Sequence, residues 1–381
     1  MKIAQVAPLA ESVPPQLYGG TERIVSWLTD ELVRQGHRVT LYASGDSDTR
    51  ARLVPVTPTA LRLRRDVVDP LPHLVQLVER VAADADQFDV LHFHIDHLHY
   101  PLLRRLSTPG ITTMHGRMDL ADLPPLFEAF RETPLVSISD SQRRPIPWAN
   151  WVATVPHGLP LGQISATTSV PDDAYLAFLG RTSPEKGIEE AIEIAYRVGR
   201  PLRVAAKVDD ADSAYFAERV QPLLERGNHV EFVGEISDAQ KDEFLGSAAA
   251  TLFPIDWPEP FGLVMVESAA RGTPVLAFRS GAVPEVIEDG VTGLIVDNVD
   301  EAVAAMPRVL ALPRDRVRAG IERRFDVARM ARDYVAVYER LIAQRVVRAL
   351  PDVPDFGIAQ ETPLEPTDII DPKPAVTSTI S

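Results

Sequence analysis

Near the start of the chain, hydrophobic positions follow two different periods. Residues 2–8 form a short apolar run that is typical of a buried strand, whereas apolar residues recur at helical spacing between residues 21 and 35. Gly36 supplies a stop signal for that helix, and a second strand pattern follows at residues 38–43. Two strands joined through a helix need a crossover connection, so we predict that they lie parallel in one sheet.

The same alternation of strand and helix patterns continues through the first half of the chain. An amphipathic stretch at residues 71–85 precedes three apolar runs with strand character, at residues 90–94, 111–114 and 135–138. We therefore predict a doubly wound parallel sheet for this half. Residues 159–174 then lack periodicity and are rich in Ser, Thr, Gly, Pro and Asp, which is the composition of a linker.

A second series of alternating patterns begins after this linker. The pattern predicts strands at residues 175–179, 202–206, 230–233, 250–255, 274–278 and 293–296, and helices at residues 188–198, 211–225, 238–248 and 263–271. The expected fold class is α/β, with two Rossmann-like, doubly wound parallel-sheet domains, at residues 1–165 and 166–329, facing a cleft. No internal sequence repeat relates the two domains, so the duplication is one of architecture.

Beyond the second domain the pattern predicts a long helix and a tail. Residues 330–350 carry Tyr334, Val337, Tyr338 and further apolar residues on one helical face. Residues 351–381 hold six prolines, six acidic residues and one aromatic residue. Such a segment buries too little apolar surface to offset the entropy lost on ordering it, so we expect it to be disordered.

Composition and charge narrow the possible functions. The chain is 45% hydrophobic and 24% charged, which is typical of a soluble globular protein. The formal net charge of -15 repels nucleic acid, so any anionic ligand must be held by local groups. The absence of cysteine excludes disulfides, thiolate zinc sites and thiol nucleophiles. The first residues fit neither a signal peptide nor a membrane-spanning helix, so we expect a cytoplasmic location.

The candidate ligand-binding residues lie in the loops that follow the predicted strands, because parallel sheets bind ligands at the carboxyl ends of their strands. The first such loop ends in Gly19 and Gly20 at the start of a helix, where free N–H groups and the helix dipole favour an anion. The spacing is not that of the dinucleotide fingerprint. Alternatively, the two glycines only turn the chain.

The loop after the first strand of the second domain contains two cations, Arg181 and Lys186, ahead of a helix. A helix N-terminus disfavours cations unless an anion lies between them, and a diphosphate would satisfy that requirement. The alternative is a solvated surface pair.

Two glutamates flank a predicted helix N-terminus at residues 254–267. Glu259 lies in a proline-flanked loop, and Glu267 follows about two helical turns inside the helix. The N–H groups near Gly262 are free to bind phosphate between them. A capping or buried-pair role would explain one glutamate but not both together with Gly262.

A histidine-rich run at residues 92–99 invites a metal-site interpretation, because alternation puts His92 and His94 on one strand face. Buried packing and hydrogen bonding explain the run equally, and we expect no metal. The basic segments at residues 62–65 and 143–145 would at most touch a membrane surface peripherally or contact an anionic acceptor, because charge runs are usually solvated.

At these residues the chain resembles the retaining GT-B glycosyltransferases of the family-four type, a superfamily that includes glycogen-synthase-like and mannosyltransferase-like enzymes. The family's E-x7-E motif matches Glu259 to Glu267, and its G-R-x4-K-G motif matches residues 180–187. The glycine pair matches Gly19 and Gly20, and residues 281–293 are similar to the family's closing segment. The resemblance covers about residues 1–345.

The resemblance implies a GT-B fold with the donor held mainly by the second domain and the acceptor by the first. It implies that Arg181 and Lys186 neutralise a diphosphate and that Glu267 binds the ribose. Glu259 would hold the transferred sugar, together with the backbone of Phe261, Gly262, Leu263 and Val264. His115 resembles the family's active-site histidine near the sugar's outer hydroxyls, and the helix at residues 330–350 would complete the first domain.

Two positions depart from the family pattern. His157 stands where many relatives have asparagine, and Lys207 and Val208 stand where a glycine pair is common. The expected activity is transfer of a hexose, with retention, from a nucleotide diphosphate sugar, preferably a UDP-sugar, to a small-molecule, glycan or lipid-linked acceptor, without a cofactor. A sugar-nucleotide epimerase and a non-catalytic nucleotide-sugar binding protein are the alternatives.

Overall fold

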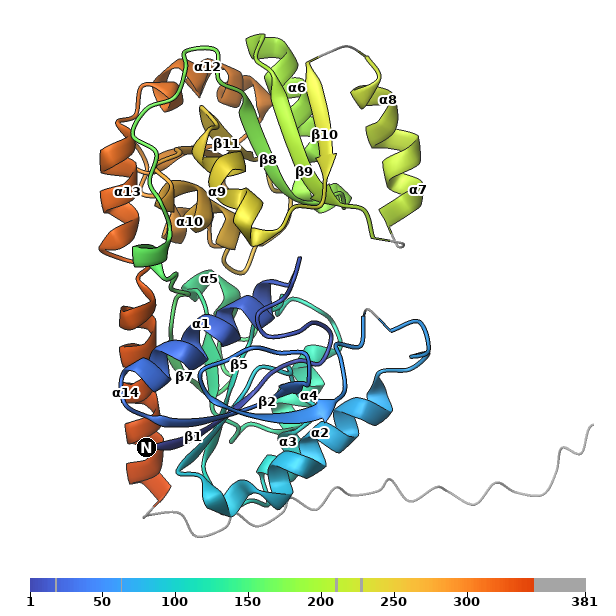
Figure 1. Cartoon of the computed structure of the whole chain (residues 1–381), viewed down its shortest axis with the longest axis vertical. Helices are drawn as coiled ribbons and strands as arrows, with labels where there is room; N and C mark the ends of the chain where they lie inside the picture. The colour runs from blue at the N-terminus through green and yellow to red at the C-terminus, as the bar shows by residue number, and fades with distance from the viewer. Residues whose placement is uncertain (18, 63, 210–211, 227–228, 346–381) are drawn as a thin grey trace, which may run out of the picture. The chain divides into compact units, whose positions relative to one another are not determined.

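The computed structural model describes residues 1–345, apart from residues 18, 63, 210–211 and 227–228. The predicted tail at residues 351–381 and the last residues of the predicted 330–350 helix lie outside the described residues. The described part contains two parallel β-sheets with flanking helices (Figure 1). The predicted α/β class is therefore confirmed.

Seven parallel strands form the first sheet. They are β1 (Lys2–Val6), β2 (Arg38–Ser44), β3 (Arg52–Thr57), β4 (Val90–Phe93), β5 (Gly110–Thr113), β6 (Leu135–Ser137) and β7 (Trp151–Thr154). Their order in the sheet is β3-β2-β1-β4-β5-β6-β7. The flanking helices are α1 (Gly20–Arg34), α2 (Leu71–Ala83), α3 (Tyr100–Leu103), α4 (Leu123–Ala129) and α5 (Asp140–Arg143). The winding direction reverses between β1 and β4, where doubly wound sheets bind ligands.

Six parallel strands form the second sheet. They are β8 (Leu176–Arg181), β9 (Leu202–Lys207), β10 (Val230–Gly234), β11 (Ala250–Phe253), β12 (Val275–Phe278) and β13 (Gly293–Val296), in the order β10-β9-β8-β11-β12-β13. The helices of this part are α6 (Ile188–Val198), α7 (Ser213–Tyr215), α8 (Gln221–Leu224), α9 (Asp238–Gly246), α10 (Leu263–Ala270), α11 (Val283–Val286), α12 (Val299–Leu310) and α13 (Arg314–Glu322). The winding reverses between β8 and β11, so the second sheet repeats the architecture of the first.

The hydrophobic pattern missed the two edge strands of the first sheet and several helices, among them α12 and α13. Strands β3 and β7 are the two edges of the first sheet, and their residues are only partly buried. An edge strand needs no continuous apolar run, and Pro55 is tolerated inside β3 for the same reason. The helix predicted at residues 211–225 is divided, because a π-helical turn at Phe216–Val220 separates α7 from α8.

The last described helix, α14 (Val327–Arg345), packs on the first sheet beside α1 (Figure 1). Tyr334 and Tyr338 are fully buried in the same core cluster as Ile3 of β1 and Ile24 of α1. The apolar face predicted for this segment is therefore the face that covers the sheet. The helix begins at Val327, ahead of the predicted start at residue 330.

The chain passes between the two sheets twice, and the two passages lie side by side. The N–H of Leu159 donates to the carbonyl oxygen of Phe325 at 2.8 Å, and the N–H of Val327 donates to the carbonyl oxygen of Leu159 at 2.9 Å. A Cβ at Gly158 would lie 2.6 Å from the carbonyl oxygen of Asp326. Glycine is required here because the two backbones approach so closely.

Candidate active site

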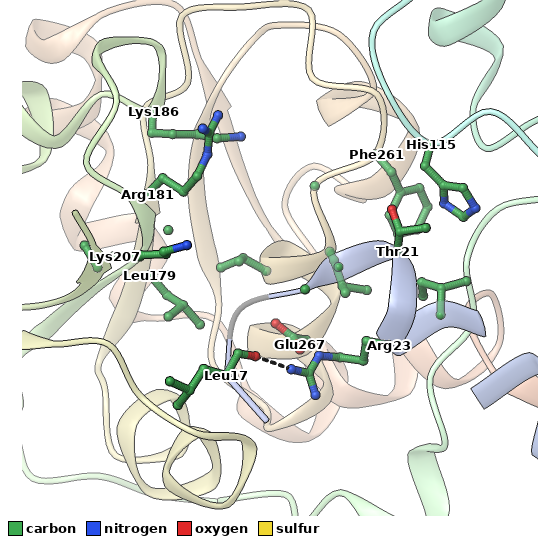
Figure 2. Close-up of a pocket in the computed structure, with 18 of the residues that line it drawn as sticks. Leu17, Thr21, Arg23, His115, Leu179, Arg181, Lys186, Lys207, Phe261 and Glu267 are labelled. Carbon is green, nitrogen blue, oxygen red and sulfur yellow. Dashed lines mark hydrogen bonds between the residues drawn. The ribbon is translucent and has the colours of Figure 1, made fainter. Parts of the chain in front are cut away.

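A pocket of about 550 Å³ lies at the carboxyl ends of the strands and is lined by residues from both sheets' loops (Figure 2). The structure brings together there every residue that the sequence singled out for the site: Gly19, Gly20, His115, Arg181, Lys186, Glu259, Phe261, Gly262, Leu263, Val264 and Glu267. Their convergence is a finding, whereas the roles assigned to them stay predictions.

Two helix N-termini point free backbone N–H groups toward the pocket. Helix α10 follows Gly262, whose φ of 82° lies in the left-handed region that favours glycine. The N–H groups of Leu263 and Val264, in the first turn of α10, donate no backbone hydrogen bond within the described part of the chain. Helix α1 begins at Gly20, after Gly19 as its N-cap. Each terminus can bind an anion or a developing negative charge.

Glu259 is positioned through one of its two carboxylate oxygens. Its Oε2 accepts from Lys186 Nζ at 2.7 Å and from Trp257 Nε1 at 2.9 Å. The Lys186 ammonium also lies over the Trp257 ring, 4.8 Å from its centre. Among the described residues, Oε1 of Glu259 has no hydrogen bond, so it is available to a ligand.

The second cation of the loop, Arg181, is held by carboxylates. Its guanidinium lies 3.1 Å from Glu185 and 4.0 Å from Asp209, and Lys207 also pairs with Asp209 at 2.7 Å. Figure 2 shows Arg181, Lys186 and Lys207 gathered in one part of the pocket. Both Arg181 and Lys186 line the pocket, as a role in ligand binding requires.

Glu267 is buried and paired with a lysine that the sequence motifs did not include. Its Oε1 accepts from Lys241 Nζ, on helix α9, at 2.7 Å. Burial by itself raises the pKa of the Glu267 carboxyl, but three cations, led by Lys241, outweigh it and hold the pKa below its usual value. The carboxylate is therefore charged, and its Oε2 has no hydrogen bond among the described residues.

A second cation near Glu267, Arg23, comes from the first sheet's helix α1. Its guanidinium forms an ion pair with Asp238 of α9 and donates to the carbonyl oxygen of Leu17 at 2.8 Å (Figure 2). No local motif could have identified Arg23 or Lys241, because they meet Glu267 only through the packing of α1, α9 and α10.

His115 follows β5 and lies in Figure 2 on the opposite side of the pocket from Arg181, Lys186 and Lys207. Its Nε2 is 2.8 Å from Nδ1 of His94, and its ring stacks on that of His157 with centres 5.3 Å apart. Burial lowers the pKa of His115 to about 3, so the imidazole is neutral at physiological pH. His157, the position that departs from asparagine, is therefore part of the pocket wall.

Two further histidines of the 92–99 run are buried and hydrogen-bonded, whereas His97 is exposed. His92 and His99 are buried and contact Thr113 and Thr112, respectively, at 2.7 Å. Within the described part of the chain, no three His, Cys, Asp or Glu side chains are grouped so that they could hold a metal ion. These contacts are examples of the buried packing and hydrogen bonding that are the alternative to a metal site.

The basic segments differ in environment. Arg62 lines the pocket and pairs with Glu11 at 2.9 Å, so it is a pocket residue rather than part of a free surface run. Arg143 donates to Oγ1 of Thr154 at 3.1 Å. A search of the described helices finds none with the length and apolar character needed to cross a bilayer.

Comparisons with known proteins agree with this geometry. Residues 163–324 match the family model "Glycosyl transferases group 1", and residues 18–155 match "Glycosyltransferase Family 4". The phosphatidyl-myo-inositol mannosyltransferase of Mycobacterium leprae is 27% identical over 377 residues, which cover 89% of this chain and 96% of that protein.

The structure is also similar to solved structures of other proteins. AviGT4, a glycosyltransferase involved in avilamycin A biosynthesis, is 28% identical with a TM-score of 0.70, and the match covers 90% of this chain and 98% of that one. HepE from Anabaena, solved in complex with UDP and glucose, shares the fold at 17% identity, with a TM-score of 0.69 and coverage of 90% and 100%.

Proposed function

The chain belongs to the GT-B glycosyltransferases of the family-four type, and from this premise we propose that it transfers a hexose from a nucleotide diphosphate sugar to an acceptor, with retention of the anomeric configuration. One observation carries the proposal. Two cations, two carboxylates with one free oxygen each and the N-terminus of α10 all converge on a single pocket. A diphosphate joined to two hydroxyl-rich sugars presents the complementary groups.

In this proposal the cations and the helix terminus stabilise the leaving group. The bond between the anomeric carbon and a phosphate oxygen breaks, and negative charge grows on the departing nucleoside diphosphate. Arg181, Lys186 and the N–H groups of α10 line the pocket and can neutralise this charge once the diphosphate replaces the carboxylates that hold Arg181. Glu267 would accept hydrogen bonds from the ribose through Oε2.

The transferred sugar would lie between Glu259 and His115. Oε1 of Glu259 can accept from a sugar hydroxyl, and its negative charge also stabilises positive charge at the anomeric carbon. His115, which is neutral and stacks on His157, would meet the outer hydroxyls. The family resemblance favours uridine as the nucleotide, and the acceptor would be a small molecule, a glycan or a lipid-linked sugar.

We propose that the diphosphate is bound without a metal ion or other cofactor, because the protein's own cations supply the positive charge. Turnover in excess EDTA should equal turnover in untreated enzyme. The assay compares product formation before chelation, after it and after adding back Mg²⁺ or Mn²⁺. Complete inhibition that either metal reverses would contradict this.

The deciding experiment incubates the protein with labelled UDP-glucose, UDP-galactose, GDP-mannose or GDP-glucose, with and without a panel of acceptors. A transferase forms a labelled glycoside only with an acceptor, and NMR of that product gives its anomeric configuration. Isomerisation of a donor alone would indicate the epimerase instead. Binding of a donor with no product from any acceptor class would favour the non-catalytic alternative.

A further inference from the structure

A buried chain of hydrogen bonds connects His115 to helix α14. His115 Nε2 lies 2.8 Å from His94 Nδ1, and the other ring nitrogen of His94, Nε2, lies 2.9 Å from Gln5 Oε1 on β1. Gln5 Nε2 donates to the Tyr338 hydroxyl at 3.1 Å. Gln5 and Tyr338 are fully buried and His94 is 3% exposed. Water therefore does not compete for these hydrogen bonds.

The hydrogen-bond network continues beyond Tyr338 and ends at Tyr334. The Tyr338 hydroxyl lies 2.8 Å from His92 Nδ1, and His92 Nε2 lies 2.7 Å from Thr113 Oγ1. Thr113 Oγ1 meets the Tyr334 hydroxyl at 2.9 Å. Tyr338 and Tyr334 thus occupy different places in one network: Tyr338 contacts Gln5 directly, whereas Tyr334 is reached only through His92 and Thr113.

The direction of the hydrogen bonds follows from the chemistry of the Gln5 amide. Its Oε1 can only accept, so His94 must carry its proton on Nε2. Burial lowers the pKa of His94 far below its usual value, so the ring is neutral and Nδ1 is a bare acceptor. His115 Nε2 must then donate to it, which leaves Nδ1 of the neutral His115 without a proton.

The Tyr338 hydroxyl completes the network in this direction. It accepts from the Gln5 Nε2 amide and can then donate to Nδ1 of His92. If the Gln5 amide turned over, every bond from His115 to His92 would have to reverse, and His115 would carry its proton on Nδ1. If the Tyr338 hydroxyl is removed, the Gln5 Nε2 group loses its acceptor. The present orientation of the Gln5 amide is then no longer favoured over the reversed orientation.

We propose that Gln5 and Tyr338 are positioning residues that hold His115 as the Nε2–H tautomer, so that its Nδ1 accepts a hydrogen bond from a hydroxyl of the transferred sugar. The acceptor role of Nδ1 rests on the proposed function, whereas the tautomer does not. The C-terminal helix α14 therefore takes part in donor recognition through the first sheet, although Tyr338 lies far along the chain from His115.

The tautomer is measured by NMR on protein labelled with 15N-histidine at neutral pH and without substrate. A protonated and a bare imidazole nitrogen have well-separated chemical shifts, and the His115→Asn variant assigns the signals. We expect wild-type Nε2 to be protonated and Nδ1 bare. In Tyr338→Phe, and independently in Gln5→Met, the His115 Nδ1 signal should move toward the protonated position.

Tyr334→Phe is the matched control, because it removes an equally buried hydroxyl from the same helix but leaves the bonds from His115 to Tyr338 intact. Its His115 signals should match the wild type even if its melting temperature falls as much as that of Tyr338→Phe. A wild-type His115 protonated on Nδ1, an unchanged tautomer in both Tyr338→Phe and Gln5→Met, or an equal change in Tyr334→Phe would overturn the proposal.

Kinetics test the role of Nδ1. The donor KM of Tyr338→Phe should rise about two- to fivefold, in proportion to the share of molecules in the wrong tautomer, whereas Tyr334→Phe keeps the wild-type KM. A shifted tautomer with an unchanged KM would overturn the assigned hydrogen bond to the sugar. If no nucleotide sugar is turned over while the NMR results hold, the proposed function fails and the tautomer assignment stands.

Discussion

Glu259 and Glu267 each give one carboxylate oxygen to a lysine and leave the other without a hydrogen bond among the described residues. The lysines lie on different elements, and no hydrogen bond among the described residues joins the two carboxylates. Glu259 is additionally held by the Trp257 indole, whereas Glu267 is buried against the cations of α1 and α9. The two carboxylates are therefore separate units that can act on different parts of one donor.

This separation predicts different kinetic effects. Glu267→Gln should mainly raise the donor KM, since the charge on a ribose hardly changes during the reaction. Glu259→Gln should mainly lower kcat, since positive charge grows at the anomeric carbon as the transition state forms. Steady-state kinetics with varied donor separates the two. Equal changes in kcat and KM in both variants, with a double variant no worse than either single, would show that the carboxylates act as one unit.

The cations should matter for the leaving group. Arg181→Ala and Lys186→Ala should each lose about 2–4 kcal/mol of transition-state stabilisation, measured from kcat/KM. Lys186→Ala should be the more damaging, because Lys186 also holds Oε2 of Glu259. Arg197→Ala, which removes an exposed ion pair with Asp300 on the back of α6, is the control and should stay within about twofold of wild type. Wild-type kcat/KM in both pocket variants would remove these cations from the site.

At the scale of residues, sequence reasoning identified what lies within short motifs. Arg181 and Lys186 share one loop, and Glu259 and Glu267 flank one helix start, so their spacing alone indicated a site. Lys241, Arg23 and Asp209 come from separate elements, and only the packed fold brings them to those residues. Trp257 stood inside the motif, but its hydrogen bond to Glu259 depends on a loop conformation that spacing does not show.

At the scale of elements, the loop that carries Glu259 is held against the segment before α11. The N–H of Ala282 donates to the carbonyl oxygen of Glu259 at 2.8 Å, and the Ser280 hydroxyl donates to that of Trp257. Gly281 has a φ of 52°, and a Cβ there would overlap the backbone of Glu259. Only glycine permits this approach.

Gly281→Ala should therefore displace the Glu259 loop and lower kcat by at least about tenfold, because a small misplacement of a catalytic group is costly. Gly290→Ala is the control: its φ of 78° imposes similar backbone strain, but nothing lies within 4 Å of the added Cβ. It should lose about 1 kcal/mol of stability and keep wild-type kcat. Steady-state assays and melting curves test both. Equal kcat in the two variants would contradict a role for the Gly281 contact.

Hydrophobic patterns predict some elements better than others. The pattern found the central strands β1, β4, β8 and β11, because strands covered on both faces are continuous apolar runs. It missed the edge strands β3 and β7, which are less buried than the central strands, and helices of four residues such as α3 and α5, which are too short to show a period. It also missed the longer helices α12 and α13.

At the scale of the whole molecule, an acidic chain presents a pocket with several cations. The formal net charge is -15, yet Arg181, Lys186, Lys207, Lys241, Arg23 and Arg62 all line one cavity, where they outnumber the carboxylates of Glu22, Asp209, Glu235, Glu259 and Glu267 by one. Such a distribution repels polyanions in general and admits a small anion at one place. Sequence composition predicted that an anionic ligand would need local groups, but the number of cations that meet in the pocket depends on how both sheets pack around it.

The last prediction follows from this charge distribution. UDP or GDP at a hundredfold excess over its dissociation constant should stabilise the native state by about 2.7 kcal/mol and raise the melting temperature, whereas NAD should not, since the dinucleotide fingerprint is absent. Differential scanning fluorimetry at fixed ionic strength measures the shift. The Arg181→Ala/Lys186→Ala double variant should lose most of it, because the diphosphate is the part those cations bind. Stabilisation by NAD, with none by either nucleoside diphosphate, would show that the pocket takes a different ligand.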